Sequence, residues 1–392
     1  NKDLQRELAY LYSQRALPKQ KAEDIPQSSR RFGEHLAELL ASSDFQSLKT
    51  ACDQFNSDFQ AQSASSPASG DSRAANFKAF LDFAKNSQAN FDMQSLQPSL
   101  EAAFAAGEAS PLPVSIEELA PDDSPSPLPD LQRILNARFA THFADDDNDS
   151  ALRTLNLMLK MSNCVLNSNN PDIAPLLETL KTAANSLSTR KWDADSLESL
   201  QQEMQRQRAR RIPQKRLLEA ERLHLLSSFE HVRQTGIRSI DGAPPGVSMI
   251  ADSVRELHPA TAVKAAKNMW TGISYDPDAD ELASLRLLKS LFGPGFMPYF
   301  KAEPALSPQA GDGELTARLR ASLFSSFRKQ SEALALMEAM DMALSIRLGE
   351  TPDKSKISPL TGKPYAILKV PDRVKIIYGQ SDADSIVVEL GR

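Results

Sequence analysis

The sequence predicts a mainly α-helical protein, an irregular multi-helix bundle that closes with a small C-terminal antiparallel β-meander. Three observations predict this fold class. Apolar residues recur every three or four positions through most of the chain, which is the period of an amphipathic helix. Glycine is scarce, at 15 of 392 residues. Only the last segment, 351–392, changes to short β-branched and aromatic runs separated by turn signals.

Composition and charge exclude some classes of protein. The chain is 41% hydrophobic and 24% charged, as in ordinary soluble globular proteins, and has room for two or three domains. Its net charge of -6 argues against a nucleic-acid partner, because nucleic-acid binding rests on a concentrated basic surface. No window approaches the roughly 18 apolar residues of a membrane helix. Since the chain begins at Asn1 in helix-like sequence, we expect that an N-terminal segment was removed and that membrane contact occurs only through it.

The N-terminal region, 1–106, is expected to be helical. Its clearest stripe lies in 44–60, where Phe45, Leu48, Cys52, Phe55 and Phe59 recur at helical spacing. Ser43 and Gln46 predict a capping box at the start of that stripe. The helices expected in this region cover 2–15, 30–42, 44–60 and 74–88, with a low-complexity loop at 62–72.

Residues 107–130 are the expected boundary between two helical regions. They contain six prolines, interrupted by one turn of helix that Ser115 and Glu118 would cap. A segment of this composition is a semi-rigid linker or an extended strap across the surface.

The main region, 131–350, is again helical. The expected helices cover about 130–143, 149–167, 172–188, 196–210, 213–234, 259–270, 279–292 and 313–348. We expect Asp149 to cap the second of these, and Asp195 with Glu198 to cap the fourth. Successive helix pairs suggest a solenoid-like packing, but the connectors differ too much in length for a regular repeat.

The segment 351–392 is expected to form the β tail. Its strands cover 365–370, 373–378 and 385–390. Three strands alone are marginally stable, so we expect the tail to pack on the helices. In the turn that precedes it, Gly362 can supply a positive φ, and Pro364 restricts Lys363 to extended geometry. Lys363 is expected to be a solvated turn residue.

Two cysteines, Cys52 and Cys164, occupy apolar positions of expected helices. They are interpreted as small buried hydrophobic residues. A disulfide between them is the alternative, and it would fit an oxidising compartment.

No metal, cofactor or catalytic residue is predicted. None of the five histidines, His35, His142, His224, His231 and His258, lies at metal-ligand spacing, although His224 and His231 share one helical face.

Two acidic runs fail as calcium loops. The run from Asp145 to Asp149 places Ser150 where glycine is required and Asn156 where glutamate is required. Asp276, Asp278 and Asp280 fail the same test and suit a helix N-terminus. The segment 246–250 lacks the second glycine of a nucleophile elbow.

One concentrated basic patch remains as a candidate binding surface. It consists of Arg206, Arg208, Arg210, Arg211, Lys215 and Arg216. Such a patch can meet an acidic partner or anionic lipid headgroups. The plainer interpretation is a solvated helix end and loop.

The tail and part of the middle of the chain resemble a group of uncharacterised bacterial proteins. Those proteins end in a proline–(phenylalanine or leucine)–threonine–glycine–lysine–proline turn and a tyrosine-containing strand, as the segment from Pro359 to Tyr365 and then Ile377 to Gly379 do here. The spacing is similar at Ala151 to Leu159, Asn170-Pro171, Leu197 to Gln201, and Glu221-Arg222 before Phe229. The group closes with an aspartate- and glycine-rich end, whereas this chain closes with Ile386 to Leu390.

This resemblance implies an extracytoplasmic, membrane-anchored helical protein and supplies no activity. We therefore expect a non-enzymatic cell-envelope interaction or scaffold protein, on the periplasmic side, whose partner is another protein. The alternative is a helical hydrolase or lyase with a pocket of dispersed carboxylates and histidines. A cytoplasmic adaptor is a third, weaker expectation. The first is favoured because helices without a convergent polar motif present broad surfaces more readily than reactive clefts.

Overall fold

The structure is a computed structural model. It describes residues 39, 41–65, 73–87, 91, 93, 96–109, 128–166, 172–189, 192–210, 277–291, 296–309, 312–370, 373–381 and 384–389, together with single positions between 214 and 225. The predicted helices at 2–15 and 259–270, most of those at 30–42 and 213–234, the capped turn at 115–118 and the segment 246–250 lie outside these residues. None of the described helices is both long and apolar enough to cross a membrane.

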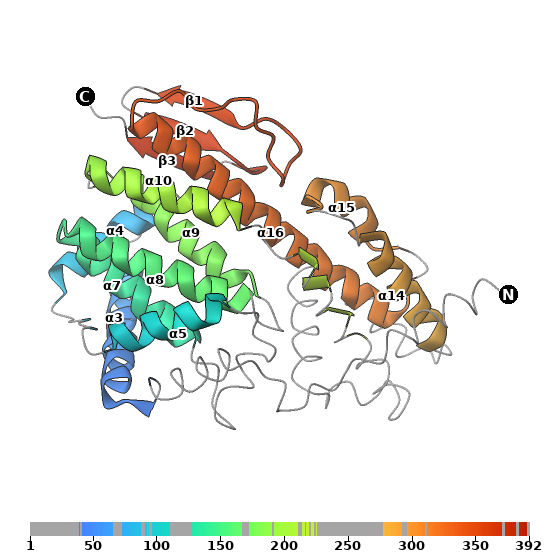
Figure 1. The fold of residues 1–392 in the computed structure, drawn as a ribbon, viewed down its shortest axis with the longest axis horizontal. Coiled ribbons are helices and arrows are strands. Elements are labelled where there is room, and N and C mark those ends of the chain that lie inside the picture. The colour runs from blue at the N-terminus through green and yellow to red at the C-terminus, as the bar shows by residue number, and fades with distance from the viewer. Residues whose placement is uncertain are drawn as a thin grey trace. The chain divides into compact units, whose positions relative to one another are not determined.

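The protein is mainly helical and ends in a small antiparallel sheet of three strands, which confirms the predicted fold class (Figure 1). The helices are α3 (Ser43–Ser65), α4 (Arg73–Asn86), α5 (Gln97–Ala109), α7 (Leu128–Ala144), α8 (Asn148–Leu166), α9 (Ala174–Ser186), α10 (Ala194–Ala209), α14 (Pro277–Leu291), α15 (Tyr299–Leu306) and α16 (Glu314–Arg347). The strands are β1 (Ala366–Val370), β2 (Arg373–Ile377) and β3 (Ser385–Glu389).

The chain divides into two compact units. The first comprises residues 1–24 and 213–328, and the second comprises 25–212 and 329–392. Helix α16 contributes its residues up to Arg328 to the first unit and the remainder to the second. Most of the linker expected at 107–130 lies outside the described residues, and the helices on either side of it, α5 and α7, both belong to the second unit.

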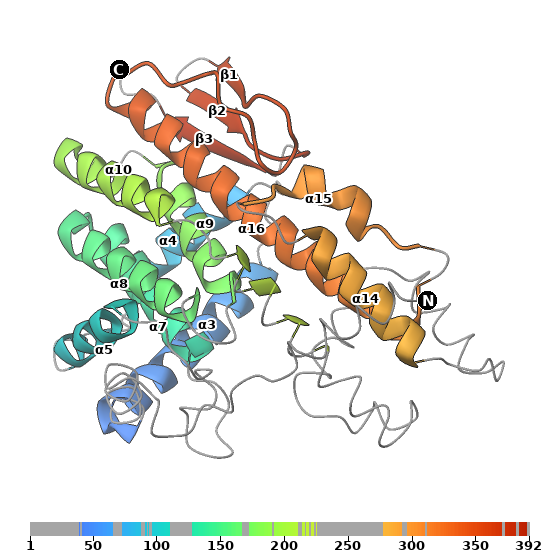
Figure 2. The same ribbon diagram turned by 45° about the vertical axis from the view of Figure 1, so that its right-hand side comes forward.

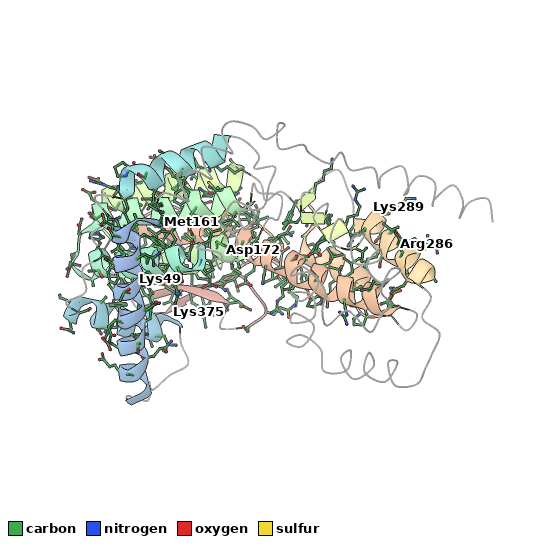
Figure 3. All side chains as sticks on the ribbon, turned by 90° about the horizontal axis from the view of Figure 1, so that it is seen from below. Lys49, Met161, Asp172, Arg286, Lys289 and Lys375 are labelled. Carbon is green, nitrogen blue, oxygen red and sulfur yellow. The ribbon has the colours of Figure 1, made fainter. Side chains whose placement is uncertain are left out.

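The core of the second unit is built around α8. Helices α5, α7, α9 and α10 all pack on α8, and Met161 (Figure 3) is one of its fully buried residues. On α7, the ring of Phe139 stacks on that of Phe143 with their centroids 5.4 Å apart, and both lie against Trp192. The indole N–H of Trp192 donates to Ser186 Oγ at 2.9 Å. Aromatic packing and one satisfied hydrogen bond therefore close this core.

Helices α3, α8 and α10 are each capped by an earlier residue than predicted. Ser42 Oγ accepts from Phe45 N at 3.2 Å, Asp147 Oδ1 accepts from Ser150 N at 3.1 Å, and Asp193 Oδ1 accepts from Ser196 N at 2.8 Å. The predictions of Ser43, Asp149 and Asp195 were therefore wrong. Those three residues already lie within the first helical turn, whereas a cap must precede that turn to reach its free N–H groups.

The first unit contains α14, α15 and the first part of α16. Buried Asp280 accepts hydrogen bonds from the backbone N–H groups of Leu315 at 2.9 Å and Thr316 at 3.1 Å. Asp280 was expected to suit a helix N-terminus, and it caps α16 although it lies on α14. Gly313 is required beside it, because a Cβ there would collide with the Asp280 carboxylate.

Two helices were not predicted. In α5, Ala103 and Phe104 are buried. The many alanines of this helix leave too few large apolar residues to show a helical period in the sequence. Helix α15 lies between the helices expected at 279–292 and 313–348, and it contains Pro304. Proline near the end of a short helix removes one backbone donor without preventing the turns before it.

The sheet has the order β1-β2-β3 with antiparallel pairing throughout. Its strands begin and end within one residue of the predicted ranges. Both views place them beside the C-terminal part of α16 (Figures 1 and 2), and β3 contacts α9. One face of the sheet, made by Val374, Ile376, Ile386 and Val388, is buried. The tail therefore packs on helices of the second unit, as expected for so small a sheet.

Candidate functional site

The turn that precedes β1 is held by backbone hydrogen bonds. Ser358 N donates to Lys363 O at 2.9 Å, and Gly362 N donates to Ser358 O at 2.9 Å. Gly362 has φ 70°, which confirms the predicted positive φ. The side chain of Lys363 is exposed, so the turn presents a cation to solvent.

Ser358 ties this turn to the far end of β2. Its hydroxyl donates to Tyr378 O at 2.7 Å and accepts from Leu360 N at 3.3 Å. Tyr378 is buried, and Ile357 forms an isolated antiparallel bridge with Pro364. The turn and the sheet therefore form one closed substructure.

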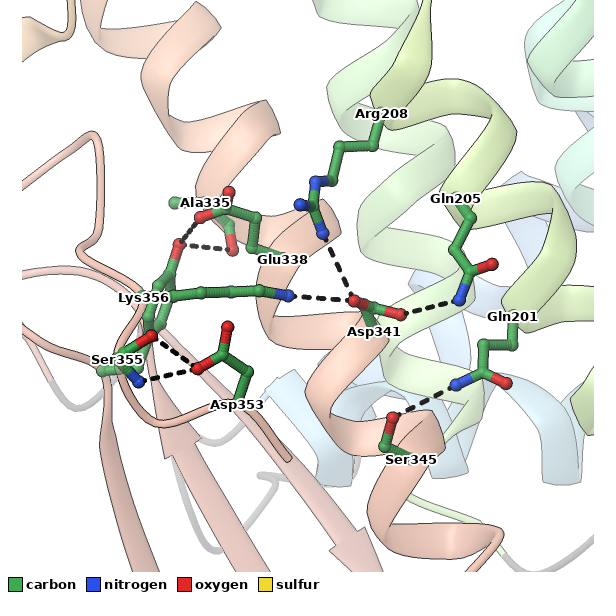
Figure 4. A network of polar contacts seen from close by, with 11 residues as sticks. Gln201, Gln205, Arg208, Ala335, Glu338, Asp341, Ser345, Asp353, Ser355 and Lys356 are labelled. Carbon is green, nitrogen blue, oxygen red and sulfur yellow. Dashed lines mark hydrogen bonds and ion pairs between the residues drawn. The ribbon is translucent and has the colours of Figure 1, made fainter. Parts of the chain in front are cut away.

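Tyr365 anchors the substructure to α16. It is buried, and its hydroxyl donates to Glu338 Oε2 at 2.6 Å (Figure 4). Burial raises the pKa of Tyr365 well above its ordinary value, and the neighbouring Glu338 carboxylate raises it further. The phenol is therefore held in its protonated form, as a hydrogen-bond donor.

Asp341 gathers a second set of polar contacts between α10, α16 and the tail (Figure 4). Its Oδ2 lies 3.0 Å from Lys356 Nζ and 3.4 Å from Arg208 Nη1, while its Oδ1 accepts from Gln205 at 3.5 Å. Partly exposed ion pairs of this kind contribute about 0–1 kcal/mol each. Their main effect is to fix the position of the tail on the helices.

The opposite side of the sheet is only partly exposed, because it is exposed on β1 and half-buried on β2 and β3. We call it the outer sheet face, and it consists of Ala366, Leu368, Lys375, Ile377 and Val387, which the strand register places together. Leu368 is 49% exposed, and Ile357 beside the turn is 56% exposed. In the part of the chain that the structure describes, these two are the exposed large hydrophobic residues. Both lie in the tail.

Strand β1 is an edge of the sheet. It pairs with β2, and no other described strand runs along its second side. An edge strand presents backbone N–H and C=O groups that a further strand can pair with. The open edge and the outer sheet face meet at Leu368.

The strands β1 and β2 lie in a strongly basic stretch. Residues 354–377 contain six basic residues against the single acidic Asp372, a net charge of +5 in a chain whose net charge is -6. Lys363 and Lys369 are exposed, and the register places Lys375 opposite Leu368 on the outer sheet face. The open edge therefore has exposed basic side chains at Lys363 and Lys369.

The basic patch predicted from the sequence is only partly described. Arg206 pairs with Glu203 at 2.7 Å, and Arg208 belongs to the Asp341 network. Arg210 and Lys215 are exposed and lie in different compact units. Arg211 and Arg216 lie outside the described residues. A binding role for this patch stays a prediction.

The described residues contain no group of three or more His, Cys, Asp or Glu side chains that could hold a metal ion. His142 Nδ1 lies 3.4 Å from Asp147 Oδ2, and burial lowers the pKa of His142. The other four histidines lie outside the described residues.

Cys52 and Cys164 are both buried and form no disulfide, as the interpretation of buried hydrophobic residues requires. Burial raises the pKa of the Cys52 thiol to about 11, and Cys164 Sγ contacts Phe104 O at 3.4 Å. Both side chains therefore act in packing.

No family model, no curated protein and no solved structure matches the chain.

Sequence reasoning did not identify the outer sheet face. The signal was present, because Leu368 and Val387 interrupt the alternation of polar and apolar residues expected of a strand with one solvated face.

Proposed function

We propose that this chain is a non-enzymatic interaction protein whose C-terminal sheet binds an extended, acidic segment of another protein along β1. The observation that carries the proposal is the open edge of β1 beside exposed Leu368.

Addition of a strand is the binding mode that fits this geometry. A peptide that pairs with an edge strand gains main-chain hydrogen bonds, and every second side chain of the peptide reaches one face of the sheet. Apolar side chains at those positions would cover Leu368 on the outer sheet face, with Val387 two strands away on the same face. The exposed apolar surface would then be removed from water.

Charge complementarity specifies the partner. An acidic segment is attracted by the basic stretch 354–377, whereas a basic segment is repelled. The rest of the chain is acidic, so the attraction would direct such a segment to the tail.

The contacts beneath the sheet support its use as a binding platform. Tyr365 and the Asp341 network hold the tail on α16 and α10 before any partner arrives. Binding then requires little ordering of the platform itself, which favours affinity.

We also propose that the interaction takes place on the outer side of the cytoplasmic membrane. This placement rests on the resemblance of the turn at 359–365 to that of membrane-anchored bacterial proteins.

The proposal can be tested with a fluorescent seven-residue peptide of alternating valine and glutamate. We expect the full chain to bind it with micromolar affinity by fluorescence anisotropy, and to bind at least tenfold more weakly at 0.5 M salt. Leu368→Asp and the double variant Lys369→Glu/Lys375→Glu should each weaken binding at least tenfold. Lys85→Glu reverses an exposed charge on α4 and serves as the matched control.

Three results would contradict the proposal. The first is equal binding of a peptide with lysine in place of glutamate. The second is unchanged binding by the Leu368 and lysine variants. The third is binding to anionic lipid vesicles without binding to the acidic peptide, which would identify the basic stretch as a membrane contact instead.

A further inference from the structure

The second unit contains a cavity at the junction of α3, α4, α7 and α9. Its volume is about 250 Å³. One side is formed by three aromatic rings, those of Phe77, Phe80 and Phe139. Polar side chains from α3, α7 and α9 complete it. This cavity is separate from the tail.

The aromatic wall is held in place by rings outside the cavity. Phe80 packs edge-on against Phe55 and Phe59, with ring centroids 5.7 Å and 5.1 Å apart. Phe139 is stacked on Phe143. Since the rings of Phe80 and Phe139 are each packed against further rings, this part of the wall is preformed for a flat apolar ligand.

The polar side of the cavity offers one donor and one acceptor. Thr182 Oγ1 donates to Asn136 Oδ1 at 3.1 Å, which leaves the Asn136 amide hydrogens as donors. Asn56 Nδ2 donates to Cys52 O at 2.9 Å, which leaves Asn56 Oδ1 as an acceptor. A ligand amide has the complementary pair of groups.

The charge beside the cavity is neutralised. Arg133 lines the cavity, but it is paired with Asp130 and, at 3.2 Å, with Asp53. Lys49 in turn pairs with Asp130 at 2.6 Å. Because two cations and two carboxylates balance here, the cavity favours a neutral ligand over an anion.

We propose that this cavity binds a small neutral aromatic or heteroaromatic amide. A dry cavity of about 150 Å³ holds benzene, so the larger volume here suits one ring with an attached polar group. The ring would lie against Phe80 and Phe139, and its amide would exchange hydrogen bonds with Asn136 and Asn56.

The experiment is a titration of the full chain with benzamide, benzoate and acetamide, followed by saturation-transfer NMR. We expect benzamide to bind with millimolar or better affinity, and at least tenfold more tightly than benzoate, which is charged, or acetamide, which lacks the ring. Ala137→Phe fills the cavity and should abolish binding. Asn136→Leu keeps the side-chain size and should weaken binding at least tenfold.

Asn185→Leu is the matched control, because Asn185 is half-buried on α9 and does not line the cavity. It should bind benzamide as the wild type does. Should Ala137→Phe fail to fold, the Asn136→Leu result decides. Equal affinity for all three probes, unchanged binding by Asn136→Leu, or no benzamide binding at 10 mM would overturn the proposal and leave a cavity that holds water only.

Discussion

The two faces of the C-terminal sheet differ in burial, most clearly at Leu368 on the edge strand β1. On the inner face, Ile376 is 0% exposed and Val388 is 0% exposed, whereas Leu368 on the outer face is 49% exposed. All three are large apolar residues in short strands. Residue type therefore does not decide which face stabilises the fold. The inner face stabilises the tail, whereas the outer face leaves Leu368 in contact with water.

The largest loss of stability is expected from a substitution on the inner face. Ile376→Ala removes buried methyl groups from the inner face and should lower the free energy of unfolding by about 2–5 kcal/mol. The measurement is urea denaturation followed by circular dichroism. A loss below 1 kcal/mol would mean that the tail is not packed on the helices as described.

The next-largest loss of stability is expected when the hydrogen bond between Tyr365 and Glu338 on α16 is removed. Tyr365→Phe removes the hydrogen bond to Glu338 and leaves that carboxylate with one partner fewer, which should cost about 1–3 kcal/mol. The same denaturation experiment measures it. A neutral result would show that Tyr365 contributes by packing alone.

The anchor also predicts a pH dependence. The pKa of Tyr365 is raised above the ordinary value of 10.0, so the folded protein holds this proton more tightly than the unfolded chain does. Its contribution is complete below pH 10 and is lost as the pH rises above 10. The stability difference between the wild type and Tyr365→Phe should therefore shrink from pH 9 to pH 11. Parallel pH curves for the two proteins would contradict this.

A smaller effect is expected in the turn. Gly362→Ala places a Cβ at φ 70° and should cost about 1–2 kcal/mol. Lys363→Ala, at the exposed neighbouring position, is the control and should change stability by less than about 0.5 kcal/mol. Equal effects of the two substitutions would argue against a strained turn.

The smallest expected effect is on the outer face. Leu368→Ala should change the free energy of unfolding by less than about 0.5 kcal/mol, because half of the side chain already contacts water. The same substitution should weaken binding of the acidic peptide. A loss of stability close to that of Ile376→Ala would remove the distinction between the faces.

Local patterns predicted most of the described fold, because helices and strands with one buried face carry a clear period. The stripe of Phe45 and Phe55 predicted α3, and the turn residues predicted the strands within one residue. Contacts between distant segments could not be predicted. Asp280 caps α16, which begins 34 residues later, and no local sequence pattern predicts this contact.

The candidate site was harder to predict for a related reason. Which face of a strand is buried depends on the register and on what packs against the sheet. With apolar residues on both faces, the sequence of β1 and β3 cannot distinguish Leu368 from Ile386. Likewise, Arg208 was expected in an open basic patch, whereas the tail brings Lys356 to the same carboxylate, Asp341.

The most direct test of strand addition at β1 is amide hydrogen exchange in the presence of the alternating valine–glutamate peptide. If the peptide adds as a strand to the open edge, exchange in 366–370 should slow at least tenfold at saturation, while exchange in 385–389 stays unchanged. Unchanged exchange in 366–370 at a peptide concentration that saturates the anisotropy signal would contradict strand addition at β1.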